Sequence, residues 1–168
     1  VATVRALKMH GGIAKDSLGK ANVEALKKGC ANLGRHIDNV KQFGVPVVVA
    51  LNRFLSDTQD EQDAVLTAAR SWGARAALSD VWATGGAGGV EVANEVLAAL
   101  DDGKANFKPL YDTALPIKQK IETIATQIYG ADGVTFSAAA EKAIVQCEEM
   151  GLGATPVCMA KTQYSFSD

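Results

Sequence analysis

The sequence has few of the residue types that build metal sites and disulfide frameworks. Its 168 residues include three cysteines, Cys30, Cys147 and Cys158, and two histidines. No CxxC pair occurs, and an odd number of widely spaced cysteines is poor material for paired bridges or a structural zinc site. We therefore expect no metal site, and cysteines that act as small apolar residues in a reducing, cytoplasmic environment.

Long apolar runs and a strong charge of one sign are also missing. No stretch of about 18 apolar residues exists, so we expect no membrane span. Lys and Arg number 17 and Asp and Glu 19, a net charge of −2 that argues against a nucleic-acid partner. The first twelve residues do not follow the plan of a signal peptide. Because the chain starts without Met and stops without a tail, we interpret it as part of a longer polypeptide.

Several catalytic motifs are absent. The sequence has no GxxxxGK[ST] phosphate loop, no GxSxG, no HExxH and no kinase motif. We therefore assign no catalytic residue, and a triphosphate site of the phosphate-loop kind would have to come from other sequence.

Short β-branched runs alternate with longer helical patterns. Strands are predicted at residues 1–7, 45–51, 75–79, 134–136 and 156–160, and helices at 21–43, 58–72, 90–100, 117–129 and 137–150. This alternation predicts βαβ units and a mainly parallel sheet with flanking helices. Because residues 101–116 break the rhythm, we expect an α/β block over residues 1–103. Residues 104–168 would then hold a connector and a smaller C-terminal α/β segment.

Candidate site residues follow the predicted strands, where parallel sheets bind ligands. His10, Gly11 and Gly12 come after the first strand; His10 could serve as an acid or base, or only cap the strand. Asn52 could read a ring edge or fix its own loop, and Arg53 could face an anion or solvent.

Two aromatic residues, Phe54 and Trp82, also follow predicted strands. A ring at such a tip must find a partner surface or stay exposed. Two rings on neighbouring tips could hold a flat heterocycle between their faces, and the alternative is that each ring closes the top of the core.

A glycine-rich run, Gly85-Gly86-Ala87-Gly88-Gly89, precedes a predicted helix. Its amide groups could bind an anion at the helix N-terminus, or the glycines could serve only tight packing.

The segments VRALKMHGG, NLGRHIDNVKQFGVPVVVALNRF, SDVWATGGAGG and KTQYSFSD give the chain a close resemblance to the formate–tetrahydrofolate ligase family over all 168 residues. The resemblance implies an internal part of a cytoplasmic enzyme with a phosphate-loop NTPase-like fold, whose phosphate loop lies before Val1. It also implies a homotetramer, ATP with Mg²⁺, a monovalent cation, and the substrates formate and tetrahydrofolate.

The family reaction implied by this resemblance transfers the γ-phosphoryl group of ATP to formate, and the folate amine then attacks formyl phosphate. By the same resemblance Phe54 and Trp82 hold the pterin ring and Leu78 lines the slot. His10, Gly11, Gly12, Asn52, Arg53, Gly85 and Gly86 are then candidates for the active-site wall. Leu55 departs from the family pattern, because many members have Pro there.

Two other functions stay open at this point. The chain could be a non-catalytic structural and assembly part of the enzyme, inactive when isolated. The adenine of ATP, another flat heterocycle, could also use the aromatic slot before the folate does.

Overall fold

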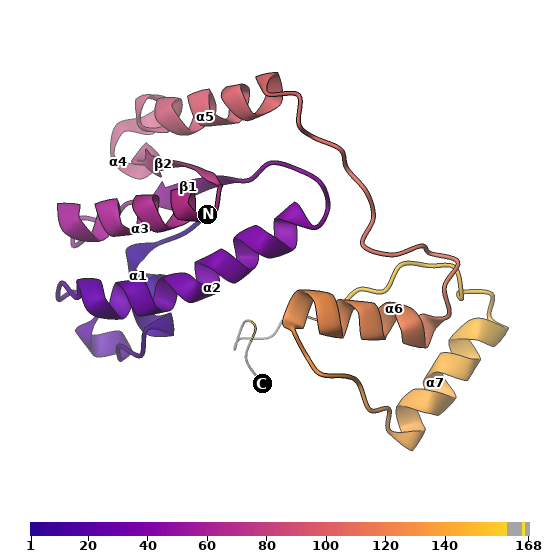
Figure 1. Ribbon diagram of the computed structural model, residues 1–168. Coiled ribbons are helices and arrows are strands. Elements are labelled where there is room, and N and C mark those ends of the chain that lie inside the picture. The colour runs from indigo at the N-terminus through magenta and orange to yellow at the C-terminus, as the bar shows by residue number, and fades with distance from the viewer. Residues whose placement is uncertain (161–165, 167–168) are drawn as a thin grey trace. The chain divides into compact units, whose positions relative to one another are not determined.

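The computed structural model describes residues 1–160 and 166, and it divides into two compact units, Val1–Phe107 and Lys108–Asp168 (Figure 1). Of the segment KTQYSFSD, only Phe166 lies among the described residues. In chain order the elements are α1 (Val4–His10), η1 (Lys15–Ser17), α2 (Val23–Lys41), β1 (Val48–Asn52), α3 (Gln59–Ser71), β2 (Arg75–Ser79), α4 (Val81–Thr84), η2 (Gly85–Gly89), α5 (Val90–Asp101), α6 (Ile117–Thr123), η3 (Ile124–Tyr129) and α7 (Ala138–Glu149).

A small parallel sheet lies at the centre of the first unit. β1 and β2 pair in parallel, with Val49 opposite Ala76 and Leu51 opposite Leu78. Ala2 adds an isolated parallel bridge to Leu51 on the other edge of β1. The strands predicted at 45–51 and 75–79 are therefore confirmed, and so is their parallel arrangement, although the described unit as a whole is mostly helical.

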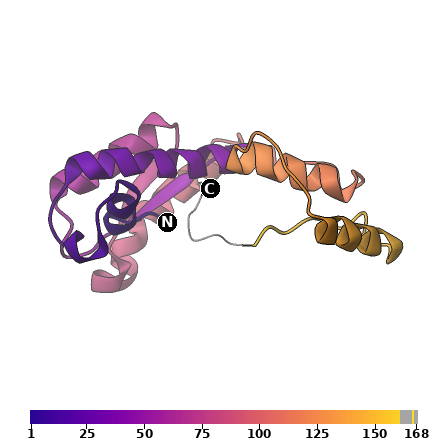
Figure 2. The same cartoon turned by 90° about the horizontal axis from the view of Figure 1, so that it is seen from below.

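Helices cover both faces of this sheet. Figure 1 shows α5 on one side of the strands and α3 with α2 on the other, and Figure 2 views the unit from the α2 side. The core lies between the strands and α1, α2 and α3, where Leu26, Ile37, Leu51 and Val65 are almost fully buried. The helices predicted for these segments are confirmed, including the capping box that Thr58 forms at the start of α3.

The strand predicted for residues 1–7 is wrong, because most of this segment is helix α1. Thr3 is the N-cap, and its side chain accepts a hydrogen bond from the Ala6 amide at 3.1 Å. Val4, Leu7 and Lys8 are buried, a spacing of three and four that suits one helix face. The β-branched start of the segment indicated a strand, but only Ala2 pairs with β1.

A buried ion pair joins α1 to α3. The Lys8 Nζ lies 2.9 Å from the Glu61 Oε1, and both side chains are 0 % exposed. Lys8 also donates to the Lys20 carbonyl, and Glu61 also accepts from the Asn22 amide and the Thr58 amide. The two charges therefore have several hydrogen-bond partners, which is the condition under which a buried pair is tolerated.

Within residues 108–160 of the second unit, helices are the only regular secondary structure. The strands predicted at 134–136 and 156–160 are therefore wrong. Neither segment has a pairing strand there, and a single short strand cannot form a sheet by itself. Lys120 is fully buried, and its ammonium group donates to the carbonyl oxygens of Thr113, Gly153 and Thr155. Backbone carbonyls thus hold the C-terminal segment of this unit in place of a sheet.

Within the described residues, no helix is both long enough and apolar enough to cross a membrane.

The buried pair predicts a large loss of stability when one partner is removed. We expect Glu61→Gln to lower the free energy of unfolding by about 3–5 kcal/mol, because the Lys8 charge then stays buried without its counter-ion. Urea denaturation measures the loss. Glu24→Gln is the control: its pair with Lys27 is exposed, and we expect a change below about 0.5 kcal/mol. Equal effects of the two variants would contradict the prediction.

The same pair predicts a loss of stability in acid. Burial by itself raises the pKa of Glu61, but the hydrogen bonds from Asn22, Lys8 and Thr58 outweigh it and place the pKa below the ordinary 4.5. A lowered pKa in the folded state stabilises the protein at neutral pH, and this contribution disappears as the pH falls below about 4.5 through the folded-state value. Denaturation midpoints measured from pH 7 to pH 3 should fall less steeply in Glu61→Gln than in the unchanged protein.

Candidate functional site

The carboxyl ends of β1 and β2 lie at the same edge of the sheet. Asn52 is opposite Ser79 in the register, and the Arg53 amide donates to the Ser79 carbonyl at 3.0 Å. The residues that follow the two strands, Arg53 and Asp80, therefore start side by side. The structure thus brings together the polar tips that the sequence placed after these strands.

An ion pair joins the two tips. The Arg53 Nη1 lies 2.9 Å from the Asp80 Oδ2, with both groups only partly exposed. The second carboxylate oxygen of Asp80, Oδ1, is buried and has no hydrogen-bond partner among the described residues. Arg53 is thus tied to its neighbour across the sheet edge, and Asp80 is a site residue that the sequence analysis did not identify.

The two predicted aromatic residues lie beside this ion pair. The Trp82 indole N–H donates to the Arg53 carbonyl at 2.7 Å, which places the indole next to the residue that precedes Phe54. Trp82 is nevertheless 54 % exposed. Phe54 is half-buried, and the guanidinium carbon of Arg5 in α1 lies 5.6 Å from its ring centre. This distance is within the range of a cation–π contact.

A tight turn positions Phe54. Its amide donates to the Asp57 Oδ2 at 2.8 Å, and the Asp57 amide donates to the Phe54 carbonyl at 3.0 Å. Leu55, 82 % exposed, is the second residue of this four-residue turn, the position at which Pro is favoured. The Pro that the resemblance implies at this position would fit the same turn, so Leu55 is compatible with the same turn shape. An Asp three residues after Phe54 is the sequence signal that could have predicted it.

The glycine-rich run folds back on Asp80 through α4 and η2. The Asp80 amide donates to the Gly88 carbonyl at 3.0 Å. A Cβ on Gly88 would lie 2.4 Å from the Thr84 hydroxyl oxygen and 2.5 Å from the Asp80 carbonyl oxygen. Tight packing therefore explains Gly88. Gly85 has a positive φ of 61°, and a Cβ added to Gly85 or Gly86 would have no neighbouring atom within 4 Å. An anion site formed by these two glycines stays a prediction.

His10 and its glycines lie at the end of a helix, not at a strand tip. Gly11 allows α1 to approach α2 closely, since a Cβ there would lie 1.9 Å from the Ala25 carbonyl oxygen. Partial burial lowers the pKa of His36 in α2, and the nearby His10 lowers it further. Thus His10 is near α2, and the role of His10, Gly11 and Gly12 as an active-site wall stays a prediction.

Leu78 and Asn52 are placed by the strands themselves. Leu78 is half-buried and packs against the core cluster, on the face that also holds its partner Leu51. The Asn52 amide donates to the Ala2 carbonyl at 2.9 Å, and its side chain is half-buried.

Arg5 is the residue that sequence reasoning missed most clearly. Its position beside Phe54 depends on α1 being a helix, and the segment was predicted as a strand. The signal was present in the spacing of Val4, Leu7 and Lys8, which indicates a helix face with Arg5 outside it.

This unit is a parallel α/β fold with an ion pair and two aromatic residues at the carboxyl ends of its strands. Ligand-binding α/β proteins bind their ligands at this position. The family model of formate–tetrahydrofolate ligase matches residues 1–168, and the chain belongs to this family, ligases of folate one-carbon metabolism. The formate–tetrahydrofolate ligases of Staphylococcus aureus strains JH9 and Newman are each 56 % identical to it over 168 residues. The match covers 100 % of this chain and 30 % of each relative.

The close packing of Gly88 predicts that the turn carrying Trp82 is sensitive to one methyl group. We expect Gly88→Ala to lower the free energy of unfolding by about 1–3 kcal/mol, because the new Cβ forces the Asp80–Gly88 turn apart. The change should also alter the fluorescence of Trp82. Gly86→Ala is the matched control, since its Cβ would meet open space; a loss as large as that of Gly88→Ala would contradict the prediction.

Proposed function

We propose that this chain is the folate-binding part of a formate–tetrahydrofolate ligase, which joins formate to tetrahydrofolate at the expense of ATP. The observation that carries the proposal is the hydrogen bond from the Trp82 indole to the Arg53 carbonyl, beside Phe54. It holds an exposed indole close to a second ring at the edge where parallel sheets bind ligands. Membership of the family supplies the chemistry.

The pterin ring would stack in the slot that these two rings form. Trp82 is fixed at one edge by its N–H, so ordering it for stacking costs little further side-chain freedom. Arg5 lies over one face of Phe54, and the ligand would take the other. Each aromatic stacking contact contributes about 0.5–1.5 kcal/mol beyond the burial of apolar area. Leu78, at the end of the apolar core, would line the slot.

The charges around the slot suit an anionic reaction partner. Arg5 and Arg53 bring positive charge to the edge of the sheet, and Asp80 neutralises only one of them. Formyl phosphate and the carboxylates of a folate are both anions. In the proposed reaction the folate amine attacks the formyl carbon and phosphate leaves. The residues named here would position the amine for that attack.

The residues of this chain do not fit the triphosphate and its Mg²⁺. The sequence has no phosphate-loop Lys, and no group of three or more His, Cys, Asp or Glu in the described part could hold a metal. We therefore assign ATP binding, formate activation and the monovalent cation to the rest of a longer, cytoplasmic and homo-oligomeric enzyme with a phosphate-loop NTPase-like fold. Residues 1–103 would carry the folate slot, and the chain alone would be inactive.

The stacking proposal predicts a selective loss of folate binding. In the full-length enzyme we expect Trp82→Ala to raise the KM for tetrahydrofolate about 10-fold, the upper end of what one stacking contact contributes. The KM values for ATP and formate should stay unchanged. Steady-state kinetics with each substrate varied in turn measures the effect.

Two further variants separate stacking from other effects. Trp82→Phe keeps a ring but loses the N–H, so we expect a smaller rise in the KM for tetrahydrofolate. Leu100→Ala, on the exposed side of α5, should change nothing. If Trp82→Ala raised the KM for ATP instead, the slot would belong to adenine, and an unchanged KM for every substrate would leave the assembly function as the better explanation.

A further inference from the structure

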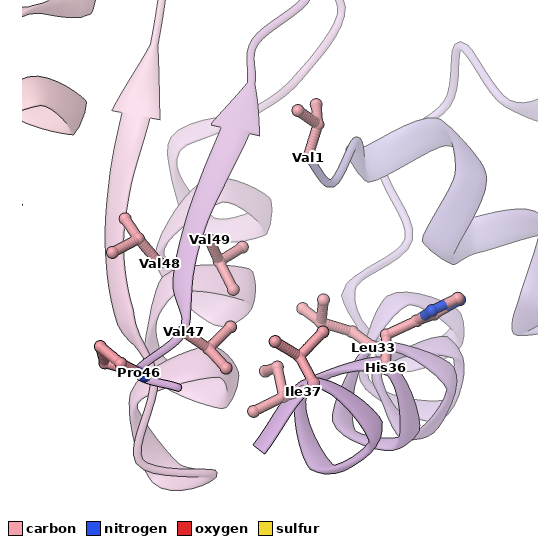
Figure 3. Close-up of a pocket in the computed structure, with 9 residues that line it drawn as sticks. Val1, Leu33, His36, Ile37, Pro46, Val47, Val48 and Val49 are labelled. Carbon is pink, nitrogen blue, oxygen red and sulfur yellow. The ribbon is translucent and has the colours of Figure 1, made fainter. Parts of the chain in front are cut away.

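An apolar groove lies between α2 and the outer edge of β1. Its volume is about 470 Å³, far more than the roughly 30 Å³ that one water takes in the liquid. Figure 3 shows Val49 of β1, and Val47 just before this strand, beside Leu33 and Ile37 of α2, with Val1 at the end of the space. A groove of this composition and size is suited to apolar side chains.

The backbone of β1 leaves hydrogen-bonding groups on the same side. Val47 and Arg53 bond to β2, whereas Ala50 and Asn52 bond to Ala2, whose amide donates to the Ala50 carbonyl at 2.9 Å. Parallel pairing alternates in this way from residue to residue. Both backbone groups of Val48 and the amide of Ala50 therefore face the side of Ala2, beyond the single bridge that Ala2 forms.

The register of that bridge fixes which side chains would enter the groove. Ala2 is opposite Leu51 and is 8 % exposed within the core cluster. Counting back along a parallel strand, the residue one before Val1 lies opposite Val49, and the residue three before Val1 lies opposite Val47. Both would share the face of Ala2, which is the face of α2.

We propose that in the full-length enzyme the segment directly before Val1 is a third parallel strand, which pairs with β1 and fills this groove. The chain covers only 30 % of each relative, so the longer proteins have further residues to supply it. The residues one and three before Val1 are then apolar. This proposal does not depend on folate binding.

Continuity favours this occupant over a second copy of the chain. The Ala2–Leu51 bridge already occupies this edge of β1, so any other strand would have to stop short of it. A segment that continues directly from Ala2 enters the correct register without the entropy cost of closing a loop.

Hydrogen exchange of the full-length enzyme, resolved to single amides by mass spectrometry, tests the proposal. We expect the Val48 and Ala50 amides to exchange about 100-fold or more slowly than in an unstructured peptide. The Asn52 amide, which donates to the Ala2 carbonyl, is the internal reference for a protected group. Exchange of the Val48 and Ala50 amides at the unstructured rate would overturn the proposal, and so would a charged residue one or three positions before Val1.

A proline variant distinguishes the possible occupants. Pro placed immediately before Val1 has no N–H to donate to the Val48 carbonyl, so we expect faster exchange at Val48 and Ala50 and a lower melting temperature. If exchange at these amides stays unchanged in the variant but speeds up when the subunits dissociate, a second copy fills the groove and the proposal is wrong. The exchange rates of the unchanged enzyme decide the question if the variant does not fold.

Discussion

The first unit depends on the burial of the Lys8–Glu61 ion pair. Two opposite charges that are 0 % exposed are tolerated in the interior when further hydrogen bonds supplement the pair. Glu61 meets this condition with the amides of Asn22 and Thr58, and Lys8 with the carbonyl of Lys20. The pair therefore connects α1, the start of α2 and the start of α3 at one point. None of the three can shift alone without breaking a hydrogen bond to one of the two buried charges.

This arrangement also positions the candidate site. Helix α3 begins directly after the turn that carries Phe54, and the Gln62 side chain donates to the Asp57 carbonyl at 3.1 Å. Helix α1 brings Arg5 over one face of the Phe54 ring. The two helices that the ion pair joins are thus the two that contact Phe54 or the turn that carries it. A substitution at Glu61 would therefore also disturb the proposed aromatic slot.

Sequence reasoning predicted the parts of this unit whose local signals agree with their tertiary environment. The apolar run around Val49 reads as a strand covered on both faces, and Thr58 with Glu61 forms the capping box that the sequence shows. The strand predicted for residues 1–7 was wrong because two signals compete in this segment. The β-branched residues favour a strand, and the helical spacing of Val4 and Leu7 prevails because it buries both against α2.

The candidate site was predictable in its aromatic residues but not in their surroundings. Phe54 and Trp82 follow strands that the sequence identifies, so their common edge could be expected. The Arg53–Asp80 ion pair and the position of Arg5 could not, because the first depends on the pairing of Asn52 with Ser79 and the second on α1 being a helix. At residues 134–136 a strand was predicted from local signals alone, but no partner strand lies beside this segment among the described residues.

The two rings of the proposed slot are held in different ways, and this difference decides how each responds to substitution. Phe54 sits on a turn closed by Asp57 and packed against α3 and α1, so its position follows the stability of the core. Trp82 stays half in solvent and is fixed by one hydrogen bond to a backbone carbonyl and by the close turn at Gly88. An exposed indole gains little from the core, so its removal costs little folding stability. For this reason Trp82 is the position at which a loss of ligand binding can be separated from a loss of fold.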